Sequence, residues 1–270
     1  MSDHPIAARW RAIRAPAGGP GRRAAFIPYV TAGYPTPQLS LELLKRAEAW
    51  GADFVEVGVP FSDPLADGPT IQRSTQAALD QGMTVPRALE QIAQAALAIP
   101  VVVMTYVNPV LAYGLERFVA DAHAAGASGL LLTDFPAGAD PAMERVVQQS
   151  SLALIRLIAP TTTPQRLGLA VRGASGFLYL ITRLGVTGAR DRVPPDLPDH
   201  VARVRAASDL PLAVGFGIST PAQARATAAL ADGVVVGSAL VEAIGAGGLA
   251  AAERLMRDLA AAVRGRADDG

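Results

Sequence analysis

The alternation of short β-branched runs with alanine-rich stretches of helical periodicity is the feature that most constrains the fold of this chain. Runs that are apolar on both faces and separated by helices are typical of a parallel sheet with right-handed crossovers. We expect eight strands, at Phe26–Thr31, Phe54–Val59, Val101–Tyr106, Gly129–Asp134, Leu154–Ile158, Phe177–Thr182, Leu212–Phe216 and Gly233–Gly237. The helical stretches between and after them include Gln38–Trp50, Val85–Leu97, Leu115–Ala125, Pro141–Gln149, Pro164–Val171, Leu197–Ala207, Pro221–Ala229 and Leu249–Arg264.

Eight such units in 270 residues predict an α/β fold closed into a (β/α)8 TIM barrel. We expect a single domain over residues 1–270, with a short N-terminal helix from about Ile6 to Arg14 and extra short helices. The alternative is an open doubly wound sheet, which usually carries a glycine-rich turn after its first strand. The sequence at Thr31–Pro35 lacks that fingerprint, which favours the barrel.

Composition excludes several classes of function. The chain contains 24 basic residues (lysine and arginine) and 24 acidic ones (aspartate and glutamate). No net positive charge therefore attracts nucleic acid or an anionic membrane. Cysteine is absent and the three histidines (His4, His123 and His200) are scattered, so we expect neither a disulfide nor a bound transition metal. The sequence shows no secretory signal and no apolar span of about 18 residues, and we expect a soluble cytoplasmic protein.

Two carboxylates stand out near the second expected strand. Glu56 interrupts the apolar run Phe54–Val59, and Asp67 lies in the proline- and glycine-rich loop that follows. A barrel places its chemistry at the C-terminal ends of the strands, so both carboxylates would face the same end. Burial there would raise the pKa of Glu56 and suit it to move a proton near neutral pH. The structural alternatives are an ion pair for Glu56, which has no evident basic partner on the strand, and a helix cap near Thr70 for Asp67.

Glycines follow the last three expected strands, at Gly185–Gly188, Gly215–Ser219 and Gly237-Ser238. Glycine lets backbone N–H groups approach a ligand, and the loops after strands seven and eight of a barrel commonly bind phosphate. The alternative for each loop is a glycine that only a tight turn requires. Other strands carry candidate pocket-wall residues at or near their C-terminal ends, namely Tyr106, Asp134 and Tyr179.

The segment Glu56–Gln72, EVGVPFSDPLADGPTIQ, resembles the signature of the tryptophan synthase α subunit family. Further segments match that family in the same order and spacing, so the resemblance covers nearly the whole chain. They are FIPYVTAGYP (Phe26–Pro35), MTYVNPVL (Met104–Leu111), LLLTDFP (Leu130–Pro136), APTTTP (Ala159–Pro164), GVTG (Gly185–Gly188), GFGIS (Gly215–Ser219) and VVVGSA (Val234–Ala239).

The resemblance implies a lyase of tryptophan biosynthesis that cleaves indole-3-glycerol phosphate to indole and glyceraldehyde 3-phosphate, with no metal or organic cofactor in this chain. It also implies a pyridoxal-phosphate-dependent β subunit as partner in an α2β2 assembly, contacted through Pro60–Pro64 and the segment around Asn108-Pro109. Glu56 matches the acid/base carboxylate, Asp67 the second catalytic carboxylate and Thr187 a loop residue that helps to order Asp67. The phosphate positions match Gly188, Gly217, Gly237 and Ser238, and the indole-pocket positions match Tyr29, Met104, Tyr106, Leu131, Asp134, Tyr179 and Phe216.

Two carboxylates suit this retro-aldol reaction. Cleavage protonates C3 of the indole and removes the proton of the adjacent side-chain hydroxyl, and one mobile carboxyl group such as Glu56 can act in both senses. Positive charge collects at the ring nitrogen, and an anion such as Asp67 can accept a hydrogen bond from the N–H of that nitrogen. We expect long loops at Pro60–Pro69 and Arg183–Pro195 to close over the substrate. Two further hypotheses stand beside this one, a free-standing lyase that needs no partner and a non-catalytic barrel that only activates a partner.

Overall fold

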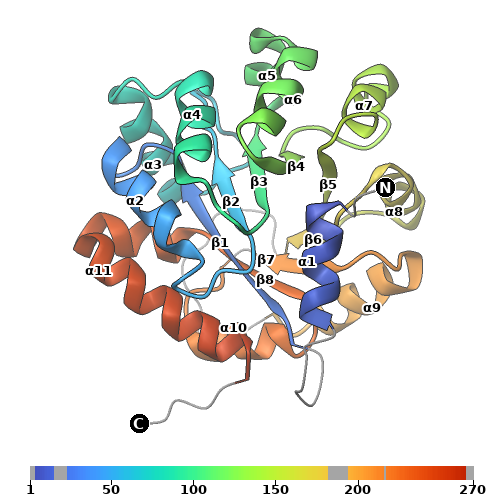
Figure 1. Cartoon of the computed structure of the whole chain (residues 1–270). Helices are drawn as coiled ribbons and strands as arrows, with labels where there is room; N and C mark the ends of the chain where they lie inside the picture. The colour runs from blue at the N-terminus through green and yellow to red at the C-terminus, as the bar shows by residue number, and fades with distance from the viewer. Residues whose placement is uncertain (1–3, 15–22, 182–193, 216, 266–270) are drawn as a thin grey trace.

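The strands form a closed parallel barrel in the computed structural model, which describes residues 4–14, 23–181, 194–215 and 217–265. Each strand pairs with the next along the chain, and the eighth pairs with the first (Figure 1). The predicted barrel is therefore confirmed, and the open sheet is excluded. The strands are β1 (Ala25–Thr31), β2 (Val55–Gly58), β3 (Val101–Thr105), β4 (Ala127–Leu132), β5 (Ala153–Ile158), β6 (Leu178–Ile181), β7 (Leu212–Gly215) and β8 (Gly233–Val236).

Helices surround the barrel on its outer side (Figure 1). Both the β2–β3 and the β3–β4 connections contain two helices, and the short helix α1 precedes the barrel as expected. The described helices are α1 (Pro5–Arg14), α2 (Pro37–Ala47), α3 (Pro69–Asp80), α4 (Val85–Ala95), α5 (Val107–Tyr113), α6 (Leu115–Ala124), α7 (Pro141–Gln148), α8 (Pro164–Gly173), α9 (Leu197–Ala207), α10 (Pro221–Ala228) and α11 (Ser238–Val263).

Two helices differ from the expectation. The sequence analysis did not predict α5, because its seven residues are too few for a helical period to show. The long helix α11 joins a helical segment that begins at Ser238 to the helix expected from Leu249. Its backbone leaves the helical conformation at Gly247 and Gly248, the latter at a φ of 61°. Glycine adopts that left-handed conformation without a steric penalty, so the two helices join at a kink.

Threonine residues begin many of the outer helices. In each case the threonine hydroxyl accepts a hydrogen bond from the backbone N–H three residues later, and a proline stands in the first helical turn. The hydroxyl satisfies a donor that the helix leaves unpaired, and proline costs nothing at a position whose N–H has no partner. These caps set where the helices start around the barrel, at Thr36, Thr84, Thr163 and Thr220.

Helix α1 closes the N-terminal end of the barrel. Trp10 is buried, and its ring lies 4.8 Å from that of Phe54 and 5.8 Å from that of Phe177, centroid to centroid. The side chains of Ile6 and Ile13 join the same apolar cluster inside the barrel. Because this end is packed with large side chains, the opposite end is left for the chemistry.

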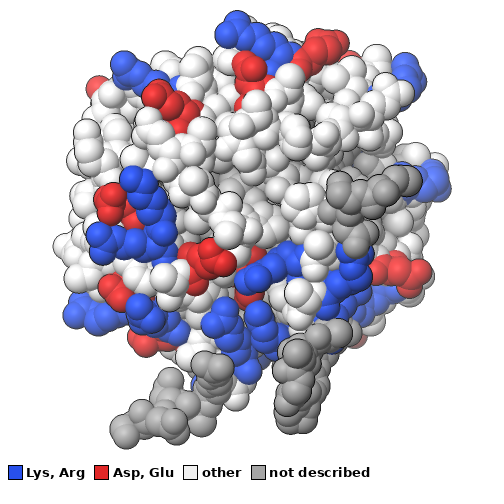
Figure 2. Space-filling model, viewed as in Figure 1, with Lys and Arg blue, Asp and Glu red and all other residues white. Residues whose placement is uncertain are grey.

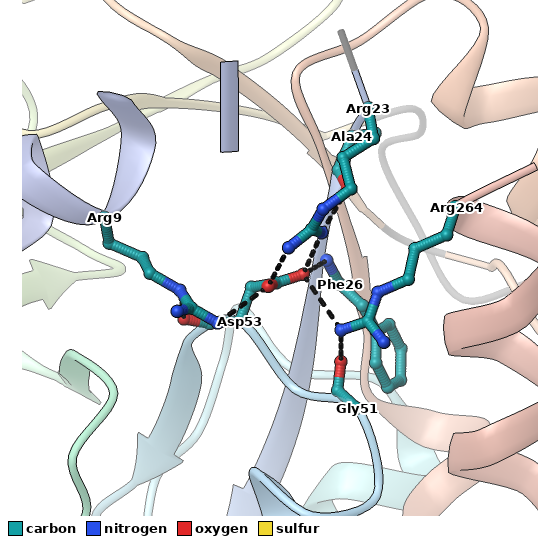
Figure 3. A network of polar contacts seen from close by, with 7 residues as sticks. All are labelled: Arg9, Arg23, Ala24, Phe26, Gly51, Asp53 and Arg264. Atoms are coloured by element: carbon teal, nitrogen blue, oxygen red, sulfur yellow. Dashed lines mark hydrogen bonds and ion pairs between the residues drawn. The ribbon is translucent and has the colours of Figure 1, made fainter. Parts of the chain in front are cut away.

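A polar network around Asp53 ties both ends of the chain to the barrel (Figure 3). The Asp53 carboxylate is fully buried and lies 2.8 Å from a guanidinium nitrogen of Arg9 in α1 and 2.7 Å from one of Arg23. It also accepts a hydrogen bond from the Phe26 N–H at 3.0 Å and lies 3.7 Å from Arg264, which follows α11. Since Asp53 lies two residues before β2, this network holds α1 and α11 against the strand that carries Glu56.

On the face that Figure 2 shows, basic and acidic side chains lie next to one another along the rim and in the lower half, and the centre is largely uncharged. This mixture agrees with the balanced count of 24 basic and 24 acidic residues. Within the described ranges, no helix combines the length and the apolar character that crossing a membrane requires.

Candidate active site

Glu56 lies on β2 and is buried, with 3% of its side chain exposed. Phe54, two residues earlier on the same face, belongs to the cluster inside the barrel, so Glu56 also points inward. Among the described residues, Oε1 of Glu56 has no hydrogen-bond partner, and Glu56 forms no ion pair. Burial, and secondarily the charge of Asp67, raises the pKa of Glu56 to about 8. The described structure thus gives Glu56 no structural ion pair and favours its protonated form at neutral pH.

Asp67 lies in the loop between β2 and α3 and is 8% exposed. Its Oδ2 accepts a hydrogen bond of 3.0 Å from the Tyr106 hydroxyl, and that hydroxyl accepts one from the Ala66 N–H, also at 3.0 Å. Burial raises the pKa of Asp67 to about 6, although the bond from Tyr106 lowers it. The cap residue of α3 is Gly68, without a side-chain cap, so the Asp67 side chain is free for another role.

Tyr29 of β1 and Tyr179 of β6 are buried close to the two carboxyl groups. Burial raises the pKa of both phenols, and the charges of Glu56 and Asp67 raise it further. Each hydroxyl lies over a glycine of the next strand. A Cβ atom at Gly58 would come within 2.1 Å of the Tyr29 hydroxyl oxygen, and one at Gly215 within 2.3 Å of that of Tyr179. Glycine is required at both positions because a larger residue would displace the ring.

Sequence reasoning missed two hydroxyl groups behind Tyr29. The Thr31 hydroxyl donates a 3.3 Å hydrogen bond to the Tyr29 hydroxyl and lies 2.8 Å from that of Ser74 on α3. One signal was present, since Thr31 is two residues after Tyr29 and therefore on the same face of the strand. The contribution of Ser74 had no such signal, because α3 reaches β1 only in the folded chain.

The other expected pocket residues occupy different surroundings. Leu131 is buried inside the barrel, and Met104 is half-buried beside both that cluster and Tyr29. Asp134 is exposed, and its Oδ1 accepts a 2.8 Å hydrogen bond from the Val107 N–H at the first turn of α5. Its carboxylate therefore holds α5 in place near the end of β4.

Part of the expected phosphate site is described. Gly237 is the cap residue of α11 without a side-chain cap, Ser238 begins that helix, and Gly217 has a φ of 81° with open space around it. A helix N-terminus with glycine beside it offers N–H groups and a favourable dipole to an anion. The expected residues Thr187, Gly188 and Phe216, and the loop residues 183–193, lie outside the described part of the chain.

The arrangement offers acid–base chemistry. Glu56 is protonated near neutral pH, whereas Asp67 is mostly ionised. The two groups are close enough for the charge of Asp67 to raise the pKa of Glu56. Across the described ranges, no group of three or more His, Cys, Asp or Glu side chains is placed to hold a metal ion.

Known proteins resemble this chain over most of its length. The sequence model of the family described as "Tryptophan synthase alpha chain" matches residues 20–267. The tryptophan synthase alpha chain of Mycobacterium avium is 46% identical over 246 residues, which cover 91% of this chain and 91% of the relative. A protein of Saccharomyces cerevisiae named tryptophan synthase is 43% identical over 227 residues, 83% of this chain, and the match spans 32% of that longer protein.

A solved structure shows the same fold. A structure of tryptophan synthase from Mycobacterium tuberculosis superimposes with a TM-score of 0.88 at 40% sequence identity, covering 97% of this chain and 99% of that one.

Proposed function

The chain belongs to the tryptophan synthase alpha chain family, and we propose that its barrel mouth performs the lyase reaction of that family through Glu56 and Asp67. The reaction is the retro-aldol cleavage of indole-3-glycerol phosphate to indole and glyceraldehyde 3-phosphate. The observation that supports these two residues is a pair of buried carboxyl groups with pKa values of about 8 and about 6. Two acids whose pKa values differ in this way provide one proton donor and one anion at the same pH.

In the proposed mechanism, Glu56 starts protonated and Asp67 starts ionised. Glu56 gives its proton to C3 of the indole, and the resulting cation donates its ring N–H to Asp67. The Glu56 carboxylate then takes the proton of the side-chain hydroxyl next to C3. The carbon–carbon bond breaks, its electrons return to the ring and the hydroxyl carbon becomes the aldehyde. Glu56 ends protonated, so proton transfers alone complete the cycle and we propose no cofactor in this chain.

We assign the rest of the substrate to the surrounding glycines and apolar side chains. The phosphate would bind at the N-terminus of α11 and the preceding loops, where backbone N–H groups can hold a dianion. The phosphate residues are Gly188, Gly217, Gly237 and Ser238, with Thr187 closing the loop over them. The indole pocket comprises Tyr29, Met104, Tyr106, Leu131, Asp134, Tyr179 and Phe216.

We further propose that the chain binds a β subunit that carries pyridoxal phosphate, in a cytoplasmic α2β2 assembly. Exposed apolar side chains beside the two expected contact segments support this surface. Leu65 is 92% exposed directly after Pro60–Pro64, and Leu111 is 54% exposed on α5, which includes Asn108-Pro109. Large apolar side chains that gather near a site on a soluble protein mark a contact with a partner.

Two alternatives make different predictions. A free-standing lyase would release indole at full rate without a β subunit, whereas a subunit should be slow until its partner is added. A non-catalytic barrel would release none, and the burial of Glu56 and Asp67 at the mouth disfavours it, because burial of unused carboxyl groups costs stability.

The test is an indole-release assay on indole-3-glycerol phosphate, with and without the β subunit. We expect Glu56→Gln and Asp67→Asn each to lower the rate by about a hundredfold or more. Asp80→Asn is the matched control, because that exposed carboxylate at the end of α3 accepts its hydrogen bond from Gln76 in the same helix. Indole production that Glu56→Gln left unchanged would remove the catalytic assignment.

A further inference from the structure

We propose that Tyr29 is a positioning residue whose hydroxyl donates a hydrogen bond to Glu56 when that carboxyl group is ionised. The inference rests on the proposed function and adds a group that serves one half of the catalytic cycle, the moment after Glu56 has given its proton to the indole. In that state a buried carboxylate requires a donor, because an unpaired charge away from water is costly.

The backbone places the two side chains together. Tyr29 and Glu56 are register partners on the neighbouring parallel strands β1 and β2. Strands in a sheet lie about 4.8 Å apart, and side chains at paired positions point to the same face. Both side chains are buried, and both point into the barrel.

Gly58 determines how far towards the barrel mouth the Tyr29 hydroxyl lies. It is two residues after Glu56, so it occupies the next inward position towards the barrel mouth. The Tyr29 hydroxyl fills the space where a side chain of Gly58 would stand, since a Cβ there would lie 2.1 Å from it. The phenol oxygen is therefore on the mouth side of Glu56, where substrate enters.

The hydrogen bonds around this hydroxyl leave its proton available. Its oxygen accepts a 3.3 Å hydrogen bond from Thr31, and the Thr31 oxygen can accept in turn from Ser74 of α3, a hydroxyl that also lies 2.8 Å from the Ile71 carbonyl. Oε1 of Glu56 is buried without a partner among the described residues. Thr31 and Ser74 thus hold the phenol in place, while the Glu56 carboxyl group, whose Oε1 no described residue holds, can move towards the phenol proton when it ionises.

The phenol remains a donor at every working pH. The titratable groups that act on it are Glu56 of β2, Asp67 of the β2–α3 loop and Tyr106 after β3. Burial first, then the charge of Asp67, raises the pKa of Tyr29 well above its usual value of 10.0. The hydroxyl is accordingly neutral across the range in which Glu56 and Asp67 change charge.

The test is the pH profile of kcat/KM for indole release by the full chain with its β subunit. The free enzyme should need ionised Asp67 and protonated Glu56, which gives an acid limb and a basic limb. In Tyr29→Phe, the pKa of Glu56 should rise, so we expect the basic limb to move up by about one pH unit. We also expect kcat to fall about five- to tenfold, because the carboxylate formed during the cycle has lost its donor.

Further variants separate this role from simple packing. Thr31→Val keeps the phenol but removes its anchor, and should move the basic limb in the same direction by less. Tyr34→Phe removes another tyrosine hydroxyl, one that lies over Gly245 on α11, and should leave the profile unchanged. A basic limb that stays in place in both Tyr29→Phe and Thr31→Val would overturn the inference, whatever happens to kcat. If Glu56→Gln is also fully active, the proposed function itself fails; if Glu56→Gln is inactive, only the role of Tyr29 is lost.

Discussion

The hydroxyl of Tyr106, at the end of β3, donates a 3.0 Å hydrogen bond to Oδ2 of Asp67, in the loop before α3. This bond acts against burial, which raises the pKa of Asp67 to about 6. It therefore helps to keep Asp67 ionised at neutral pH, and it connects the loop to the barrel wall.

We expect Tyr106→Phe to move the acid limb of the kcat/KM profile up by about one pH unit, because Asp67 loses the hydrogen bond that favours its charged form. The loss of activity should be about fivefold near pH 6 and smaller near pH 8, where Asp67 ionises in both proteins. Tyr113→Phe is the control, since that hydroxyl bonds to Asp121 away from the two carboxyl groups. A uniform loss at all pH values would show that Tyr106 acts only by holding the loop.

We expect Glu56→Gln to unfold at higher urea concentration than the native sequence at alkaline pH. The folded-state pKa of Glu56, about 8, lies above the ordinary value of 4.5, so the folded protein holds this proton more tightly than the unfolded chain. Stability from this group is complete below about pH 4.5 and is lost as pH rises towards 8. By pH 8 the variant should gain roughly 4 kcal/mol relative to the native sequence, compared with the difference between the two below pH 4.5.

The measurement is the free energy of unfolding in urea from pH 5 to pH 9. The gap between the two proteins should widen with pH up to about 8 and then stop widening. Glu253→Gln, in an exposed pair with Arg257, should show no such trend. A gap that is constant across the pH range would contradict the burial argument.

We expect Asp53→Asn to lower stability by about 3 kcal/mol while kcat of the folded enzyme is unchanged. Removing one partner of a buried ionic network leaves the arginines without their anion, and their partial exposure moderates the loss. Burial alone would raise the pKa of Asp53, but the hydrogen bonds from Arg23 and Phe26 outweigh burial and lower it. The native sequence should therefore lose this stability only as pH falls below about 3.8.

Thermal unfolding with a parallel indole assay checks this expectation. Glu42→Gln, in an exposed pair with Arg46, serves as the comparison and should have almost no effect. A fall in kcat as large as that from Glu56→Gln would mean that the Asp53 network also shapes the barrel mouth.

We expect Leu65→Ser to weaken binding of the β subunit about tenfold, because burial of a leucine side chain in a contact contributes on the order of 1.5 kcal/mol or more. Titration of the β subunit against indole release measures the effect, and the rate of the isolated chain should be unchanged. Leu169→Ser, on α8 and 39% exposed, is the matched control. Equal effects of the two variants would argue against the loop after β2 as the contact surface.

The sequence predicted the barrel because each strand is apolar on both faces and the stretches between the strands show helical periodicity. Those properties are local, so the period of apolar residues is readable without coordinates. The short helix α5 was not predicted, because seven residues are too few to show a helical period. A carboxylate in a buried strand was likewise visible, and the rise in the pKa of Glu56 follows from its burial.

The sequence by itself thus determined which residues carry charge, which strand holds Glu56 and that both carboxyl groups face one end of a barrel. Only the tertiary structure decided their partners. Tyr106 is 39 residues from Asp67, and Ser74 is 43 residues from Thr31, yet each pair is within hydrogen-bond distance. Closure of the sheet sets such contacts, because the distance between side chains of separate strands and helices depends on register and packing, and no local pattern encodes it.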